Sequence, residues 1–160
     1  MAKEIERKYL VANDAWRANA QEGDALRQGY LAAEKSHSVR VRLRAGKGTL
    51  TIKSGQTVEA GEAGVRDEYE YVIPADEASA MLDRLCHRPL IEKTRYLVEH
   101  GGHTWEIDVF AGENVGLVVA EVELTSADEA VELPSWVGED VTDDPRYLNA
   151  NLAQTPYSAW

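Results

Sequence analysis

Residues 4–8 of this 160-residue chain read Glu4-Ile5-Glu6-Arg7-Lys8. Successive side chains of a β-strand point to opposite faces, so residues two apart share a face at a spacing of about 7 Å. As a strand, this segment places Glu4, Glu6 and Lys8 together. It therefore predicts a strand with one strongly charged face.

The same alternation recurs along the chain. The segment Arg40-Val41-Arg42-Leu43-Arg44 puts three guanidinium groups on one face and aliphatic side chains on the other. Similar spacing groups Thr51 with Lys53, Arg66 with Glu68 and Glu70, Lys93 with Arg95, Glu106 with Asp108, and Glu121 with Glu123. The opposite faces carry side chains that proteins normally bury, namely Val39, Val41, Leu43, Ile52, Tyr69, Tyr71, Trp105, Ile107, Val109, Val122 and Leu124.

A charged face on a single strand is ordinarily the solvated outer face of a sheet. Like charges two apart on nearly every strand favour another arrangement, because adjacent like charges are unfavourable without a ligand. We therefore expect the charged faces to point inward around a water-filled lumen, and the apolar faces to lie outward beneath amphipathic helices. Carboxylates suit a hard cation and basic groups suit phosphate oxygens, so the pattern indicates a site for a metal-bound polyanion.

Short segments rich in β-branched and aromatic residues predict an antiparallel barrel or a strongly curved sheet. Tight hairpins are expected at Gly46-Lys47-Gly48 and Gly101-Gly102, because glycine takes a positive φ without steric cost. The expected strands are residues 3–11, 27–33, 38–45, 49–54, 66–73, 91–99, 103–110 and 116–124.

Helical spacing and capping residues predict a helix over 76–88 with Asp76 as N-cap, and two shorter helices over 126–133 and 144–153. A weaker helix is expected near 13–21. The stretch 54–65 is rich in glycine and has no period, which predicts a mobile loop.

Composition excludes several classes of protein. The 17 basic and 28 acidic side chains give a net charge of -11, so general nucleic-acid binding is not expected, and a polyphosphate site requires clustered Lys and Arg with a metal ion. No apolar stretch approaches the roughly 20 residues that span a bilayer, and neither membrane insertion nor export is expected. The lone Cys86 predicts a buried thiol and a reducing cytoplasm. The length predicts a single domain over residues 1–160.

Taken together and in order, the motifs resemble those of the triphosphate tunnel metalloenzymes, also called the CYTH superfamily. Residues 4–8 resemble the ExExK signature of that family, and the compact length resembles its small bacterial inorganic triphosphatases. The resemblance covers essentially the whole chain and continues through Arg27-Gln28-Gly29-Tyr30-Leu31, Arg42-Leu43-Arg44, Leu50-Thr51-Ile52-Lys53, Glu68-Tyr69-Glu70, Glu92-Lys93-Thr94-Arg95-Tyr96, Glu106-Ile107-Asp108-Val109-Phe110, Glu121-Val122-Glu123-Leu124 and Asp144-Pro145-Arg146-Tyr147.

The resemblance implies an α+β fold: a closed antiparallel eight-stranded β-tunnel with a charged interior and an apolar outer face covered by helices. It implies a divalent metal, Mg²⁺ or Mn²⁺, held by Glu4, Glu6 and Glu123, with Glu121 in or near the metal site. The phosphate-binding residues that it implies are Lys8, Arg42, Arg44, Lys53, Arg66, Lys93 and Arg95. Arg40 shares their face by strand parity but lies outside the matching motif.

The reaction expected from this resemblance is hydrolysis of a linear triphosphate, with inorganic tripolyphosphate giving diphosphate and phosphate. Lys93 is the candidate that orients or deprotonates the attacking water, and Tyr30 is a candidate either to hydrogen-bond Lys8 or to serve as a packing residue. The alternatives are thiamine triphosphate hydrolysis, adenylyl cyclase activity of the class IV type, RNA 5′-triphosphate processing and a non-catalytic polyphosphate-binding module. The expected partner is a small triphosphate, with no nucleic acid or membrane, and the sequence assigns no oligomeric state.

Overall fold

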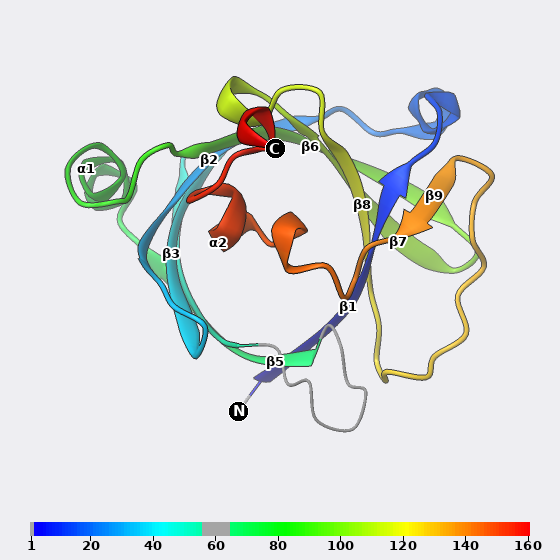
Figure 1. Ribbon diagram of the computed structural model, residues 1–160, viewed down its shortest axis with the longest axis horizontal. Coiled ribbons are helices and arrows are strands. Elements are labelled where there is room, and N and C mark those ends of the chain that lie inside the picture. Colours follow the sequence, from blue (N-terminus) through cyan, green and yellow to red (C-terminus); the bar gives the residue numbers. More distant parts are fainter. Residues whose placement is uncertain (1, 56–64) are drawn as a thin grey trace.

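The computed structural model describes residues 2–55 and 65–160, so most of the loop expected over 54–65 lies outside the described residues. Its main element is one antiparallel sheet that curls into a closed ring (Figure 1). The strands are β1 (Ala2–Val11), β2 (Asp24–Ala33), β3 (His37–Arg44), β4 (Lys47–Ser54), β5 (Val65–Ile73), β6 (Ile91–His100), β7 (His103–Phe110), β8 (Val118–Glu123) and β9 (Val137–Asp140).

The ring closes because β1 changes neighbours along its length. Strands follow one another in the order β5-β4-β3-β2-β6-β7-β8-β1. The first residues of β1, Ala2–Ile5, pair with β5, whereas residues 6–10 pair with β8. The short strand β9 was not expected from the sequence and adds to β1 outside the ring. The prediction of a closed antiparallel eight-stranded tunnel is therefore confirmed.

Two tight hairpins fix the register between neighbouring strands. Gly101 and Gly102 both have positive φ, as a two-residue hairpin turn with primed geometry requires. The first hairpin turns one residue earlier than expected, at Ala45 and Gly46, which also both have positive φ. Lys47 and Gly48 consequently belong to β4 and pair with β3.

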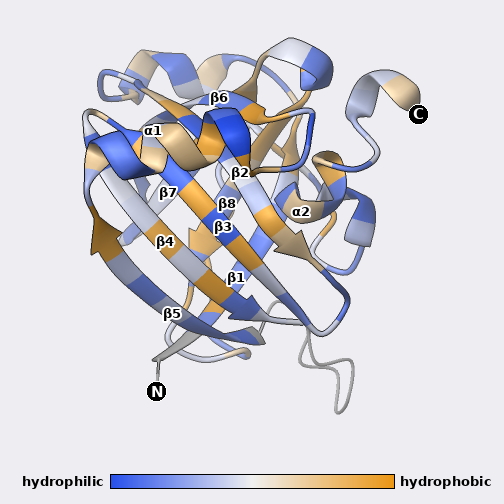
Figure 2. Ribbon diagram, turned by 90° about the vertical axis from the view of Figure 1, so that its left-hand side faces the viewer, coloured by the Kyte–Doolittle hydropathy of each residue, from blue (hydrophilic) through white to orange (hydrophobic). Residues whose placement is uncertain are grey.

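Helix α1 (Ala75–Arg84) covers the outer face of β3 and β4 (Figure 2). Leu82 and Ala78 are fully buried against Val41 of β3. Gly48 permits this close approach, because a Cβ atom at that position would lie 2.8 Å from the Cβ of Ala78. Cys86 is buried in the same cluster, as expected.

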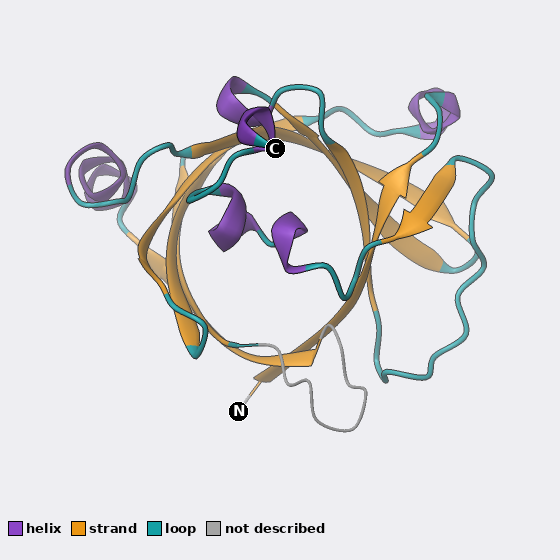
Figure 3. Cartoon of the chain, in the orientation of Figure 1, coloured by secondary structure: helices purple, strands orange, loops and turns teal. Residues whose placement is uncertain are grey.

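The remaining outer face is covered mainly by loops and one short 3-10 helix (Figure 3). The 3-10 helix η1 (Ala15–Asn19) inserts Trp16 against Tyr96, and Trp136 packs edge-on against Trp105 at 5.6 Å. The outer cluster that these side chains build comprises Tyr9, Trp16, Val98, Trp105, Ile107, Ala120, Val122, Leu124 and Trp136. Tyr69 and Tyr71 of β5 are exposed, contrary to the expectation that their face is buried.

A third apolar cluster lies inside the barrel, which sequence parity did not suggest. By register, Tyr30 lies opposite Arg40, Phe110 opposite Lys93 and Val119 opposite Asp108, so these apolar side chains share the inward face with the charged ones. The inner-end cluster comprises Tyr30, Ile91, Phe110, Leu117, Val119, Val141, Tyr147, Leu152 and Ala153. The lumen is therefore apolar and filled at one end.

The C-terminal segment enters the ring to complete the inner-end cluster (Figure 1). It was expected to form one helix over 144–153, but it divides into η4 (Pro145–Tyr147) and α2 (Asn149–Leu152) around the extended residue Leu148. The short 3-10 helices η3 (Gly112–Asn114) and η5 (Tyr157–Ala159) lie against each other near this end.

Two other helix predictions need correction. The helix expected over 126–133 is wrong, because the Glu129 carboxylate accepts hydrogen bonds from the backbone and hydroxyl of Thr125 and the chain forms turns and extended backbone there. The helix expected over 76–88 begins after Pro74 rather than at an Asp76 cap and ends at Arg84. Beyond it, the amide of His87 donates to the carbonyl of Tyr30, which draws the chain back toward β2.

We predict that Leu82→Ala lowers the free energy of unfolding by about 3 kcal/mol, because it opens a cavity between α1 and β3. The matched control is Leu85→Ala at the residue that follows the helix, where Leu85 is 66% exposed, and this variant should change stability by less than about 0.5 kcal/mol. Urea denaturation of both variants measures the difference. Equal losses of stability would show that α1 does not anchor the outer face through Leu82.

Candidate active site

A cavity of about 300 Å³ occupies the lumen beside the inner-end cluster. All but two of its described lining residues come from the barrel strands, and Asn149 and Ala150 of α2 contribute from the C-terminal segment. The lining residues are Glu4, Glu6, Lys8, Tyr30, Ser38, Arg40, Arg42, Arg44, Lys53, Arg66, Glu68, Glu70, Lys93, Arg95, Glu106, Glu121, Glu123, Asn149 and Ala150.

Charge in this cavity is divided between two halves of the ring. The basic half consists of β4, β3, β2 and β6, whose charged lining residues are Arg40, Arg42, Arg44, Lys53, Lys93 and Arg95. The acidic half consists of β7, β8, β1 and β5, which contribute Glu106, Glu121, Glu123, Glu4, Glu6, Glu68 and Glu70. Lys8 and Arg66 are basic residues within the acidic half. The lumen thus presents cations to one side of a ligand and carboxylates to the other.

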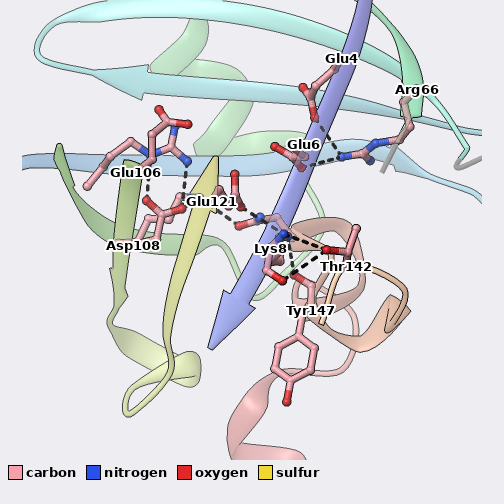
Figure 4. A network of polar contacts seen from close by, with 12 residues as sticks. Glu4, Glu6, Lys8, Arg66, Glu106, Asp108, Glu121, Thr142 and Tyr147 are labelled. Carbon is pink, nitrogen blue, oxygen red and sulfur yellow. Dashed lines mark hydrogen bonds and ion pairs between the residues drawn. The ribbon is translucent and has the colours of Figure 1, made fainter. Parts of the chain in front are cut away.

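Ion pairs join the two halves where β4 meets β5. The ammonium of Lys53 lies 2.7 Å from Glu4 and 3.6 Å from Glu68. Arg66 lies 3.4 Å from Glu4 and 3.7 Å from Glu6 (Figure 4). Burial raises the pKa of Glu4, but the charges of Lys53 and Arg66 outweigh it and hold that pKa well below the usual range. Burial and the nearby carboxylates Glu121 and Glu4 raise the pKa of Glu6.

A second junction forms where β6 meets β7. Lys93 Nζ lies 2.7 Å from Asp108 Oδ2, and Arg95 donates to both oxygens of Asp108 at 2.8 and 2.9 Å. Arg95 also pairs with Glu106 at 3.0 Å. Burial lowers the pKa of Lys93 to about 7, with Asp108 acting in the opposite direction. Burial raises the pKa of Asp108, but the two cations outweigh it and lower that pKa to about 2.

Lys8 is held by the acidic half and by the C-terminal segment (Figure 4). Its ammonium lies 3.4 Å from Glu121 and donates to the backbone carbonyl of Tyr147 at 3.0 Å. The hydroxyl of Thr142 accepts a hydrogen bond from the Lys8 amide at 3.0 Å and thereby fixes the backbone. Tyr30 lines the same cavity and packs in the inner-end cluster.

Two guanidinium groups of the basic half lack a carboxylate partner within the described residues. Arg42 donates to the amide oxygen of Gln28 at 2.9 Å, and Arg40 donates to the hydroxyl of Thr51 at 3.3 Å. Burial, together with Arg40 and Arg95, lowers the pKa of Arg42 to about 9. Buried cations without compensating charge favour an anionic ligand in the space that they face.

The carboxylates have the donor chemistry that a hard divalent cation prefers. Glu6 lies directly opposite Glu123 in the register of β1 and β8, and Glu4 lies two residues along the same face of β1. Their side chains are not gathered into a coordination sphere, because residues 2–55 and 65–160 contain no close group of three His, Cys, Asp or Glu side chains that could hold a metal ion. Glu4 would have to leave Lys53 and Arg66 to join such a site. The donor set therefore fits a metal after side-chain rearrangement.

Every site residue expected from the sequence lines this one cavity. Arg40, which fell outside the matching motif, lines it as well and is buried. Arg44 lies nearer solvent, where it pairs with Asp24 at 2.8 Å. Sequence reasoning missed Gln28, Asp24 and Asn149 as partners of the basic residues. Gln28 and Asp24 lie on β2 facing Arg42 and Arg44, which an alignment of strand registers would have revealed, whereas no local pattern marked Asn149.

The fold and the cavity define a β-tunnel protein whose interior is charged. Within that class, the chain belongs to the CYTH domain family, whose model matches residues 2–157. The described residues contain no helix long and apolar enough to cross a membrane.

Similar proteins share nearly the full length of the chain. An inorganic triphosphatase of Acetivibrio thermocellus is 49% identical over 158 residues, which cover 98% of this chain and 97% of that protein. An inorganic triphosphatase of Nitrosomonas europaea is 40% identical, with 94% of this chain and 96% of that protein covered. A crystal structure of an inorganic triphosphatase superposes with a TM-score of 0.66 at 36% identity, covering 96% of this chain and 95% of that one.

We predict that Asp108→Asn lowers the free energy of unfolding by about 3 kcal/mol at neutral pH, because it leaves Lys93 and Arg95 buried without their shared carboxylate. The folded pKa of Asp108 is below its ordinary value of 3.8, so its contribution is fully present above pH 3.8 and is lost as pH falls toward about 2. Denaturant titrations at several pH values measure both effects. As a control, Asp83→Asn removes an exposed pair with Arg27 and should cost less than about 0.5 kcal/mol.

Proposed function

We propose that this chain is a metal-dependent inorganic triphosphatase, which hydrolyses tripolyphosphate to diphosphate and phosphate inside the barrel. The observation that carries the proposal is the basic half of the cavity, where Arg40, which is buried, and Arg42, which is half-buried, have no carboxylate partner among the described residues. A linear polyphosphate supplies the missing negative charge along the length of that wall. The full-length similarity to two inorganic triphosphatases supports the same activity.

In this proposal the basic residues grip the phosphate chain from one side. Arg40, Arg42 and Arg44 follow one another along β3 at the two-residue spacing of a strand face, and Lys53, Arg66, Lys93, Arg95 and Lys8 extend the grip around the lumen. Guanidinium groups suit this role because they donate several hydrogen bonds in a fixed plane. Holding the chain in one orientation supplies much of the rate enhancement in phosphoryl transfer.

The carboxylates of the opposite half are the proposed metal ligands. CYTH triphosphatases are metal-dependent in general. Here Glu4, Glu6 and Glu123 would hold Mg²⁺ or Mn²⁺, with Glu121 beside them. A divalent cation in that position supplies electrostatic stabilisation to phosphoryl oxygens and to the leaving group. If Glu4 joined the metal site, Lys53 and Arg66 would lose their contact with it, and each would keep one other carboxylate neighbour, Glu68 and Glu6 respectively.

Lys93 is the proposed general base. Its pKa of about 7 permits a neutral amine near neutral pH, and the amine faces the cavity from β6. In the proposed step, a water molecule attacks the terminal phosphorus, its proton passes to Lys93 Nζ, and the bond to the bridging oxygen breaks to release diphosphate. We further propose that the whole chain acts as one domain in the cytoplasm, in keeping with its single buried cysteine.

We predict that Glu4→Gln, Glu6→Gln and Glu123→Gln each abolish release of phosphate from tripolyphosphate, because each removes a charge from the proposed metal site. Far-ultraviolet circular dichroism should remain that of the wild type. EDTA should stop the wild-type reaction, and Mg²⁺ or Mn²⁺ should restore it. Glu92→Gln, an exposed change on β6, is the matched control and should leave turnover unchanged. Metal-dependent turnover near the wild-type rate in one of the three variants would remove that residue from the ligand set.

We also predict that kcat/KM for tripolyphosphate exceeds that for ATP by at least about tenfold. The described lining side chains are charged or polar except for Tyr30 and Ala150, so the cavity offers adenosine little apolar contact. Steady-state kinetics with both substrates at matched Mg²⁺ give the ratio. Thiamine triphosphate belongs in the same panel, and preference for it or for ATP would overturn the substrate assignment.

A further inference from the structure

The C-terminal segment contributes a side chain to the cavity next to the proposed base. Asn149 is the first residue of α2, and its Oδ1 atom accepts a hydrogen bond from Lys93 Nζ at 3.2 Å. The amide must present its oxygen to the amine, because an amide nitrogen donates and does not accept. Asn149 therefore contacts Lys93 through a neutral acceptor.

This contact completes the hydrogen bonding of a neutral lysine. A neutral amine has two N–H bonds and one lone pair, and Lys93 has two acceptors, Asp108 Oδ2 at 2.7 Å and Asn149 Oδ1 at 3.2 Å. With both N–H bonds engaged, the lone pair is left for the cavity that Lys93 lines. The side chain is 1% exposed and its Nζ lies 5.4 Å from the ring of Phe110, so packing restrains other orientations.

We propose that Asn149 is a positioning residue, which directs the lone pair of Lys93 toward the water that attacks the substrate. The inference rests on the proposed function of Lys93. It assigns to the C-terminal segment a part in the chemistry besides its part in filling the inner end of the lumen.

An amide at this position orients the lysine without adding charge. The charged groups that act on Lys93 are Asp108 of β7, Arg95 of β6, Arg42 of β3 and Glu121 of β8. Asp108 and Glu121 raise the pKa of Lys93, whereas burial and the two arginines lower it. A second adjacent carboxylate would raise the pKa further and keep the amine protonated near neutral pH. Asparagine supplies the acceptor and leaves that balance intact.

The packing of α2 holds Asn149 in place. Leu152 and Ala153 are buried in the inner-end cluster, and the Ala153 amide donates to the Asn149 carbonyl at 3.0 Å. Two residues before Asn149, the carbonyl of Tyr147 accepts from Lys8 at 3.0 Å. The C-terminal segment therefore contacts Lys8 and Lys93, two of the lysines that line the cavity.

The first test is the pH dependence of kcat with tripolyphosphate at saturating Mg²⁺. Asn149→Asp adds a negative charge beside Lys93, so the acidic limb of the profile should move to higher pH by about one unit or more. Asn149→Ala removes an acceptor of the protonated amine, so the limb should move to lower pH while kcat at its maximum falls by about tenfold or more and KM changes less.

Asn151→Ala is the matched control on the same helix. Asn151 donates to the carbonyl of Pro145 and does not line the tunnel cavity, so this variant perturbs α2 without touching Lys93. Its profile should coincide with that of the wild type. If both Asn149 variants also keep the wild-type limb, or if Asn151→Ala shifts it equally, the positioning role is wrong.

The second test does not depend on turnover. The ¹³Cε resonance of Lys93, assigned by its loss in Lys93→Arg, is titrated in the metal-free protein. The midpoint should rise in Asn149→Asp and fall in Asn149→Ala relative to the wild type. An unchanged midpoint in Asn149→Asp would overturn the inference whatever the kinetics show. Failure of the wild type to hydrolyse tripolyphosphate would instead overturn the proposed function, so the two failures are distinguishable.

Discussion

The structure depends on how charge is balanced inside a closed barrel. Every second side chain of eight strands points into one lumen, where like charges repel strongly unless opposite charges or a ligand compensate them. The chain meets this constraint by placing cations on one half of the ring and carboxylates on the other. Ion pairs form where the halves meet, at Glu4 with Lys53 and at Asp108 with Lys93 and Arg95. Arg40 and Arg42, in the middle of the basic half, have no carboxylate partner among the described residues.

The positions of the buried apolar residues follow from the same constraint. Because the lumen is occupied by charge, hydrophobic burial has to occur elsewhere: beneath α1, in the outer cluster around Trp105, and at the inner end that the C-terminal segment fills. The inner-end cluster also serves the charged cavity, since it anchors the backbone carbonyl of Tyr147 and the amide of Asn149 against Lys8 and Lys93. Residues 144–153 therefore contribute both to apolar packing at the inner end and to the polar contacts of Lys8 and Lys93.

Strand parity was sufficient to predict a lumen with a charged lining, because a period of two survives wherever a strand is regular, whereas the closed eight-stranded tunnel was implied by the family resemblance. It placed residues as far apart as Glu4 and Arg95 in one cavity without any knowledge of strand order. Local helix patterns were less reliable, because a side chain expected to cap a helix can form its hydrogen bonds elsewhere. The capping pattern at Ser126 and Glu129 predicted a helix, but Glu129 bonds to Thr125 instead. Asn149 was missed because its contact with Lys93 depends on how α2 enters the barrel, which local sequence does not encode.

The inner-end cluster has a further consequence for how a ligand enters and leaves the lumen. Side chains such as Phe110 and Leu152 fill the lumen at that end, with exposures of 4% and 0%, so no phosphate chain can thread from one end to the other. Whatever enters must leave by the end where Glu123 is exposed. Arrival and departure are therefore mutually exclusive events at one opening. The lumen is therefore a pocket that is closed at one end, and a second ligand can enter only after the first has left.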